Sequence, residues 1–174
     1  MNRQAYARRM GAFACALLAL ATAAGAKTVY VSAEGKADYV SIRAAVEACK
    51  SGDTIVLEPG VYFGLGNQDI TFSGKALTVR GQEPNDPAVV ADTIIDCQGG
   101  GLATHYAIGA VRNGETRLTL AGLTITKGVD VFAGGAVRCE EADLDAINCV
   151  FRDNQIDSWG GAIYCRDNRV RLIG

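Results

Sequence analysis

Apolar and polar positions in the second half of the chain repeat with a period of 26 residues. The segment Gly-Gly-Ala-Val-Arg-Cys that begins at Gly134 returns as Gly-Gly-Ala-Ile-Tyr-Cys at Gly160. Other positions of the same template in successive units are Leu118, Leu144 and Val170; Leu120, Ala146 and Leu172; Gly122, Asn148 and Gly174; and Ala110-Val111 with Ala136-Val137. A period in the twenties, made of short apolar runs and turn residues, predicts the stacked coils of a solenoid.

Each repeat holds three short runs of alternating apolar and polar residues, which indicate three strands per coil. The strands expected on this basis are residues 28–32, 54–58, 76–79, 93–97, 106–111, 118–120, 123–126, 136–139, 144–146, 149–152, 162–165 and 170–172. We therefore predict an all-β fold, a right-handed single-stranded parallel β-helix with three strands in each coil of about 26 residues.

One segment has helical rather than alternating periodicity. Apolar residues in 41–50 recur at helical spacing, Ser41 is a good N-cap, and the turn at 51–53 ends the pattern. We expect this short helix to cap the apolar end of the first coil. Residues 82–90, with Pro84 and Pro87, are expected to form a loop, and no second helix is predicted.

The first 26 residues are typical of a secretion signal. Arg3, Arg8 and Arg9 precede an apolar run that ends in small residues at Ala24-Gly25-Ala26. The mature chain, residues 27–174, is then a single β-helix domain in which residues 97–174 form three regular coils. We expect an exported protein, located in the periplasm, on the outer surface or in the medium.

Composition excludes some function classes. Of the 17 basic residues three lie in the leader, against 19 acidic residues, so the mature chain is acidic and has no basic patch for nucleic acid. No apolar segment long enough to cross a membrane remains in it. Because Leu118 and Leu120 face inward, Arg117 faces outward, and Asp143 and Arg169 follow it in a column of alternating charge.

Five cysteines remain in the mature chain, and two of them share one place in the repeat. Cys139 and Cys165 lie 26 residues apart, so parallel stacking brings their Cα atoms to about 4.8 Å, within reach of a disulfide. The alternative is a stack of buried free thiols. We favour the stack, because both side chains share the inward face with Val137 and Ile163.

A second column places like charges above one another. Glu115, Glu141 and Asp167 are separated by the repeat length, which is unfavourable unless water or a cation surrounds them. We favour solvated turn carboxylates over a metal site. No cofactor is expected, apart from Ca²⁺ if the protein is a lyase.

Two parts of the chain resemble known β-helix families. The stretch from Val31 to Tyr62 resembles the opening of pectin-lyase-like proteins, pectinesterases among them, through Asp38-Tyr39-Val40-Ser41-Ile42, Ala44-Ala45-Val46, Gly52-Asp53-Thr54-Ile55 and Pro59-Gly60-Val61-Tyr62. The later segments Gly134-Gly135-Ala136-Val137, Gly160-Gly161-Ala162-Ile163 and Phe151-Arg152-Asp153-Asn154 are similar to the GGA(I/L/V) and FxxN repeats of polymorphic outer-membrane proteins. Both resemblances imply a right-handed parallel β-helix and say little about activity.

The catalytic segments of those families are not found. The sequence holds neither a GxxDFIFG-like nor an LGRPW-like segment of pectinesterases, and no Gly-His-Gly turn surrounds His105, its single histidine. We therefore expect a non-catalytic scaffold of surface or adhesin-like type with a polysaccharide or cell-surface partner. The alternative is a polysaccharide-active enzyme, either pectate/uronate lyase-like or pectinesterase-like, or its inactive remnant.

The alternative has a few candidate residues. Arg112 and Arg138, aligned one coil apart, are candidates to hold an acidic sugar, and Asp153 is a further catalytic candidate that could hold a cation. The candidates for ligand binding are Trp159, Tyr164 and Asp157. For each of them ordinary surface or packing roles are the alternative.

The sequence ends at Gly174, where the template places Gly122 and Asn148 in earlier units. A coil without a cap exposes apolar side chains and strand edges. We expect further coils after this position, or self-association through the uncapped end.

Overall fold

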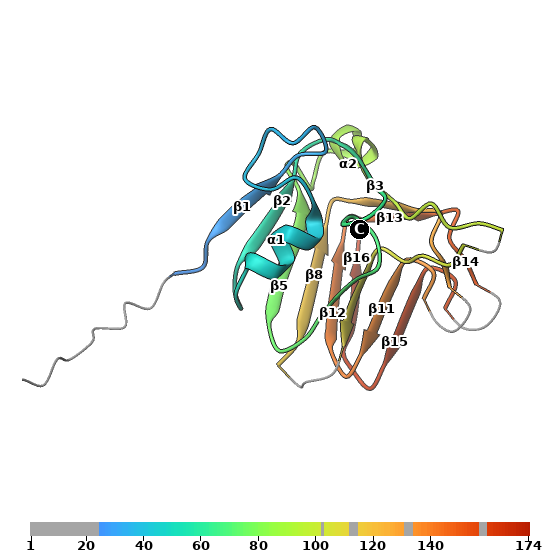
Figure 1. The fold of residues 1–174 in the computed structure, drawn as a ribbon. Coiled ribbons are helices and arrows are strands. Elements are labelled where there is room, and N and C mark those ends of the chain that lie inside the picture. The colour runs from blue at the N-terminus through green and yellow to red at the C-terminus, as the bar shows by residue number, and fades with distance from the viewer. Residues whose placement is uncertain (1–24, 102, 112–114, 131–133, 157–159) are drawn as a thin grey trace, which may run out of the picture.

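The computed structural model describes residues 25–101, 103–111, 115–130, 134–156 and 160–174. The expected leader lies almost entirely outside these residues. Within them the chain forms a right-handed parallel β-solenoid of about 5 turns, as the repeat predicts (Figure 1). No helix in the described part of the chain is long and apolar enough to span a membrane.

Three parallel sheets form the walls of the solenoid. The first sheet contains β1 (Thr28–Val31), β2 (Thr54–Leu57), β5 (Ala76–Gly81), β8 (Arg117–Ala121), β12 (Asp143–Ile147) and β16 (Val170–Ile173). The second sheet contains β3 (Gly60–Phe63), β6 (Thr93–Asp96), β9 (Thr124–Thr126) and β13 (Val150–Arg152). The third sheet contains β4 (Ile70–Phe72), β7 (Ile108–Val111), β11 (Val137–Glu140) and β15 (Ile163–Arg166), and a short pair joins β10 (Val129–Asp130) to β14 (Gln155–Ile156).

The register of the first sheet confirms the repeat from β8 onward. Leu144 is the Cα partner of both Leu118 and Val170, and Asp143 is the partner of Arg117. Leu118 and Leu144 are fully buried in the common core, whereas Arg117 points outward and donates to Asp143 at 3.0 Å. A slip of one residue would exchange these two sets, so apolar burial fixes the register.

The predicted capping helix is present as α1 (Ile42–Ala48). The Ser41 side chain accepts a hydrogen bond from the Ala44 amide, as expected of an N-cap. Ile42, Ala45 and Val46 are buried in the core cluster, and the helix contacts β1, β2 and β4. These contacts cover the core at the N-terminal end of the solenoid.

The expected loop at 82–90 is wrong in part, because it contains the start of a second helix, α2 (Pro87–Asp92). Asp86 caps this helix and Pro87 occupies its first turn, where the missing amide costs nothing. Val90 is buried, and its carbonyl accepts from the Thr124 hydroxyl at 2.8 Å. The helix therefore packs across the outer face of the second sheet, against β6 and β9.

The 26-residue alignment is also wrong before β8. In the third sheet Val137 pairs with Ile108 and Cys139 with Ala110, so Ala110-Val111 does not lie beside Ala136-Val137. The reason is the length of one turn. Residues 112–116 separate β7 from β8, whereas only residues 141–142 separate β11 from β12. Residues 97–174 are therefore not three equal coils; the regular period begins at β8.

The sequence pattern missed four short strands: β3, β4, β10 and β14. Two of them, β3 and β4, belong to the first coil, where Gly60 and the turn residues around Gly66 interrupt the alternation. The other two have only two residues each, too short for a periodic signal.

The insertion before β6 makes a close contact that tests this packing. Gly122 has φ +61°, and a Cβ atom added to it would lie 2.2 Å from the Cα of Pro84. Gly101 has nearly the same dihedral, φ +60°, but nothing lies within 4 Å of its added Cβ. We expect Gly101→Ala to cost about 1 kcal/mol from backbone strain alone. Gly122→Ala should cost about 3 kcal/mol, because it adds a clash with backbone atoms.

Urea unfolding of the two variants measures this difference. If both variants lost the same free energy of unfolding, the close contact between Pro84 and Gly122 would be contradicted.

Candidate functional site

The outer face of the third sheet brings several polar side chains together. Thr71, Gly109, Arg138 and Tyr164 are successive Cα partners in one outward row. Glu140 and Arg166 are partners in the next outward row. We call these two rows, with the Tyr106 ring, the third-sheet face.

Tyr106 lies over the gap that Gly109 leaves in this face. Its hydroxyl makes a 2.7 Å hydrogen bond with the Thr71 hydroxyl. A Cβ atom added at Gly109 would lie 3.5 Å from both the Tyr106 ring and Thr71 Oγ1, and 3.6 Å from the Arg138 carbonyl oxygen. The absence of a side chain at this position thus lets the aromatic ring lie close to the sheet, next to Arg138.

A largely buried carboxylate, that of Glu140, lies in the middle of the face. The Glu140 side chain is only 10% exposed; it accepts from Arg138 Nε at 2.7 Å and from Arg166 Nη2 at 3.1 Å. The two arginines are more exposed, at 35% and 53%. The hydrogen bond to Glu140 is the main cause of the raised pKa of Arg138. These three groups together carry one net positive charge.

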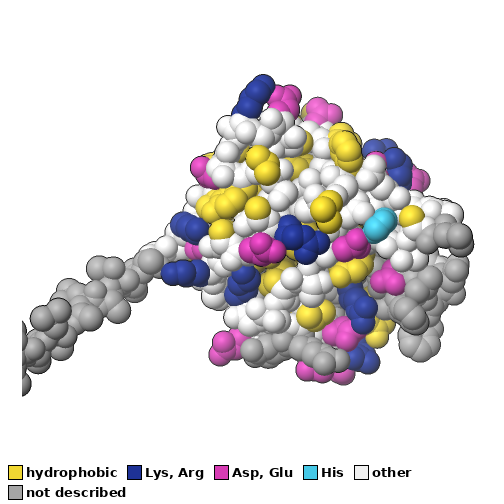
Figure 2. All heavy atoms as spheres, viewed as in Figure 1, with side chains coloured by type: hydrophobic (Ala, Val, Ile, Leu, Met, Phe, Trp, Pro, Cys, Tyr) yellow, Lys and Arg dark blue, Asp and Glu magenta, His cyan; other side chains and the backbone are white. Residues whose placement is uncertain are grey.

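A carboxylate and the single histidine meet beside this face. His105 Nδ1 lies 2.7 Å from Asp69 Oδ2, and both side chains are about one third exposed. The other carboxylate oxygen of Asp69 accepts from the Tyr106 amide at 3.1 Å. Figure 2 shows the histidine at the surface with acidic side chains near it. No sequence pattern indicates this pair, because it joins Asp69, the residue before β4, to the irregular stretch between β6 and β7.

The candidates for acidic-sugar binding are only partly brought together. Arg138 and Tyr164 are neighbours, as expected. Arg112 lies outside the described residues, and the alignment that placed it beside Arg138 is wrong, since Arg138 pairs with Gly109. Asp153 lies in the turn after β13, at the end of the second sheet, where it is exposed with φ 56°. Asp157 and Trp159 lie outside the described residues.

The three stacked acidic residues occupy exposed turns. Glu115, Glu141 and Asp167 are all exposed, and Glu141 and Asp167 have positive φ. No group of three or more His, Cys, Asp or Glu side chains within the described ranges could hold a metal ion.

The aligned cysteines Cys139 and Cys165 are Cα partners, and both are free thiols in the structure. The hydrogen bond between the two thiols, followed by burial, raises the pKa of Cys139, and the same hydrogen bond lowers the pKa of Cys165. Burial, with a smaller contribution from Asp96, raises the pKa of Cys97 to about 12. None of the deeply buried thiols is thus suited to act as a nucleophile at neutral pH.

Thiol labelling tests this order of reactivity. At pH 8 in the folded chain that begins at Lys27, we expect Cys97 and Cys139 to react at least about a hundredfold more slowly than in urea. Cys165 should react first, because its pKa is lowered and its side chain is partly exposed. Peptide mass spectrometry identifies the labelled sites. Labelling of Cys97 at the same rate in the folded and unfolded chain would contradict this burial.

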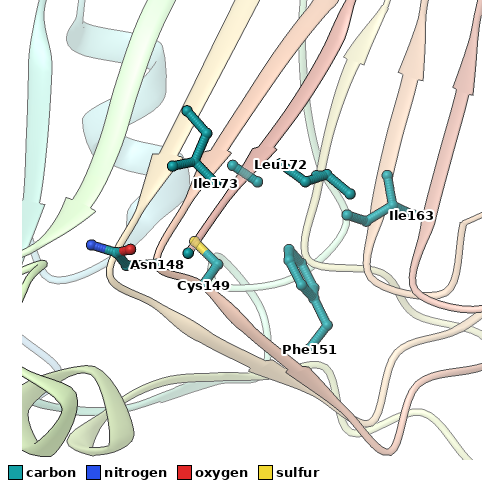
Figure 3. A pocket seen from close by; sticks show the side chains of 8 residues that line it. Asn148, Cys149, Phe151, Ile163, Leu172 and Ile173 are labelled. Atoms are coloured by element: carbon teal, nitrogen blue, oxygen red, sulfur yellow. The ribbon is translucent and has the colours of Figure 1, made fainter.

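An apolar recess of about 250 Å³ lies at the last described coil (Figure 3). Phe151, Ile163 and Leu172 line it, together with Cys149 and Asn148. Leu172 is 64% exposed although its partner Ala146 is 4% exposed at the same place in the preceding coil. The recess is therefore lined by side chains at positions that are buried in the preceding coil. Its apolar lining does not define a polar ligand site.

No protein-family model matches the chain, and neither a curated protein nor a solved structure shows significant similarity to it. The fold and the side-chain geometry therefore carry the functional argument.

Proposed function

We propose that the chain is an exported, non-catalytic β-solenoid scaffold of surface or adhesin-like type that binds an acidic polysaccharide on the third-sheet face. The resemblance of residues 31–62 to pectin-lyase-like proteins, and of the Gly134 and Gly160 segments to polymorphic outer-membrane proteins, supports this class. The leader-like segment at residues 1–26 supports export.

The observation that carries the proposal is the Arg138–Glu140–Arg166 cluster between two tyrosines. An arginine has five N–H donors. The contacts with Glu140 use Nε and Nη2 of Arg138 and Nη2 of Arg166, so each guanidinium keeps further donors for a ligand carboxylate. Tyr106 and Tyr164 add aromatic surface on the two sides of Arg138, which suits the apolar face of a sugar ring.

The geometry of a solenoid favours a polymer over a small ligand. Successive coils repeat about every 4.8 Å along the axis, so an extended chain lying across the strands meets a new row of side chains at each coil. Two cavities, one at the last described coil and one beside α2, are lined by other residues than those of this face. A scaffold that presents regular faces has no need of an enclosed pocket.

Binding of oligogalacturonates and alginate oligomers, measured by calorimetry, tests this proposal. Arg166→Ala should weaken binding about tenfold, because it removes one cation and leaves Glu140 paired with Arg138. The matched control is Arg117→Ala, an ion-paired arginine of similar exposure on the first sheet, which should leave the affinity unchanged. Equal effects of the two substitutions, or no binding of either glycan by the unmodified protein, would refute the proposed face.

The second candidate function is a carbohydrate-active enzyme of the lyase or esterase type. The Asp69–His105 pair favours it, since a carboxylate-held imidazole is a common general base. The assay is the appearance of unsaturated products, reducing ends and released methanol on pectin, polygalacturonate and alginate, with and without calcium. The scaffold proposal expects no turnover above the level of His105→Ala. Turnover that is lost in both His105→Ala and Arg138→Ala would establish the enzyme instead.

A further inference from the structure

We propose that Asp69 and His105 form a proton-sensitive clamp that holds Tyr106 across Gly109 and thereby tunes ligand binding on the third-sheet face. The effect on binding depends on the proposed function, whereas the clamp itself does not. Neither residue lies in the two rows of the face. Both are positioning residues, which act through Tyr106.

The clamp has a defined geometry. Asp69 binds two consecutive residues, His105 through its ring and Tyr106 through its amide, and the Asp69 amide donates to the Tyr106 carbonyl at 2.7 Å. The His105 carbonyl in turn accepts from the Val129 amide of β10 at 2.8 Å. At its other end, the Tyr106 hydroxyl is bonded to Thr71. The aromatic ring is therefore fixed from its backbone and from its tip.

The protonation states follow from the partners. An ionised carboxylate only accepts hydrogen bonds, so Nδ1 of His105 must carry a proton toward Asp69, and Nε2 is the position that gains or loses one. The carboxylate is charged in both states of the ring, so protonation at Nε2 adds a positive charge to the donor and strengthens this hydrogen bond further. We therefore expect Tyr106 to be held more firmly when His105 is charged than when it is neutral.

Other charged groups surround the clamp. Arg43 of α1 donates to the carbonyl oxygens of Gln68 and Asp69, and the Asp96–Lys127 ion pair links the ends of β6 and β9 next to the 97–107 segment. Asp130 follows Val129 in β10. Arg138, in β11, is the strand partner of Gly109, over which the Tyr106 ring lies. The Cys97 thiol also interacts with Asp69, and burial raises its pKa to about 12. Imidazole is the side-chain type here whose ordinary titration range lies near neutral pH.

Asp69→Asn and His105→Asn distinguish an effect that acts through Tyr106 from a direct effect of the histidine charge on the ligand. Asp69 has φ 53°, a conformation that asparagine tolerates well, so Asp69→Asn should preserve the turn while weakening the hold on His105. That variant keeps the titrating imidazole. His105→Asn removes the titration and leaves a neutral side-chain donor in its place.

The first measurement needs no ligand. Because the untagged chain has one histidine, NMR of the imidazole nitrogens assigns its tautomer without ambiguity. We expect the Nδ1–H form at pH 8 and Tyr106 ring resonances that shift between pH 8 and 5.5. The ring shift should disappear in Asp69→Asn and in His105→Asn. An Nε2–H tautomer, or a Tyr106 shift that persists in Asp69→Asn, would overturn the clamp.

The second measurement uses oligogalacturonate as the probe. Affinity of the unmodified protein should rise about fivefold from pH 8 to pH 5.5, and most of this rise should be lost in Asp69→Asn. A full rise in Asp69→Asn would show that the imidazolium charge acts directly on the ligand, which contradicts the clamp. If no glycan binds at either pH, the proposed function fails, and the NMR result alone decides whether the clamp exists.

Discussion

Parallel hydrogen bonding between successive coils is the constraint on which the rest of the structure depends. It makes residues that are distant in sequence into vertical neighbours, so that one apolar template supplies a continuous core and one polar template supplies an outer face. Leu118 and Leu144 show the first effect, since both are fully buried in the same column. Arg171 and Asp145 show the second, with a bidentate pair at 2.7 and 2.9 Å whose hydrogen bonds lower the pKa of Asp145.

The part of the candidate site formed by Asp69, His105 and Tyr106 lies where the solenoid departs from this regularity. Two insertions, at 82–92 and 97–107, lengthen the coil that contains β5, β6 and β7. The first places α2 over the second sheet, and the second brings His105 and Tyr106 to Asp69 and Thr71 of the coil before. A repetitive scaffold provides rigid strands, and an irregular segment held against them adds the chemistry.

The sequence predicts the parts of the fold that repeat. The spacing of Leu118, Leu144 and Val170 predicted the parallel stacking and the outward Arg117–Asp143 pair, and the three apolar runs in each repeat predicted the three sheets. The predicted pairing of Ala110 with Ala136 was wrong, because an alignment with one fixed period does not allow for a connection that is three residues longer. The start of α2 carried a readable signal, an aspartate cap followed by proline at the first helical position, but two prolines close together suggested a loop.

The site was less predictable than the fold for a related reason. Arg138 and Tyr164 lie in the regular coils, and their proximity followed from the period. Asp69 and His105 are 36 residues apart, across a coil of unusual length, so no repeat relates them. The position of Tyr106 depends on Gly109, whose missing side chain has a meaning only after the register is known.

Cross-strand NMR contacts in the third sheet test the register most directly. The account predicts backbone contacts from Arg138 to Gly109 on one side and to Tyr164 on the other, with Cys139 between Ala110 and Cys165. Contacts that place Arg138 beside Arg112, or that show these strands running antiparallel, would contradict the stacking and the face built on it.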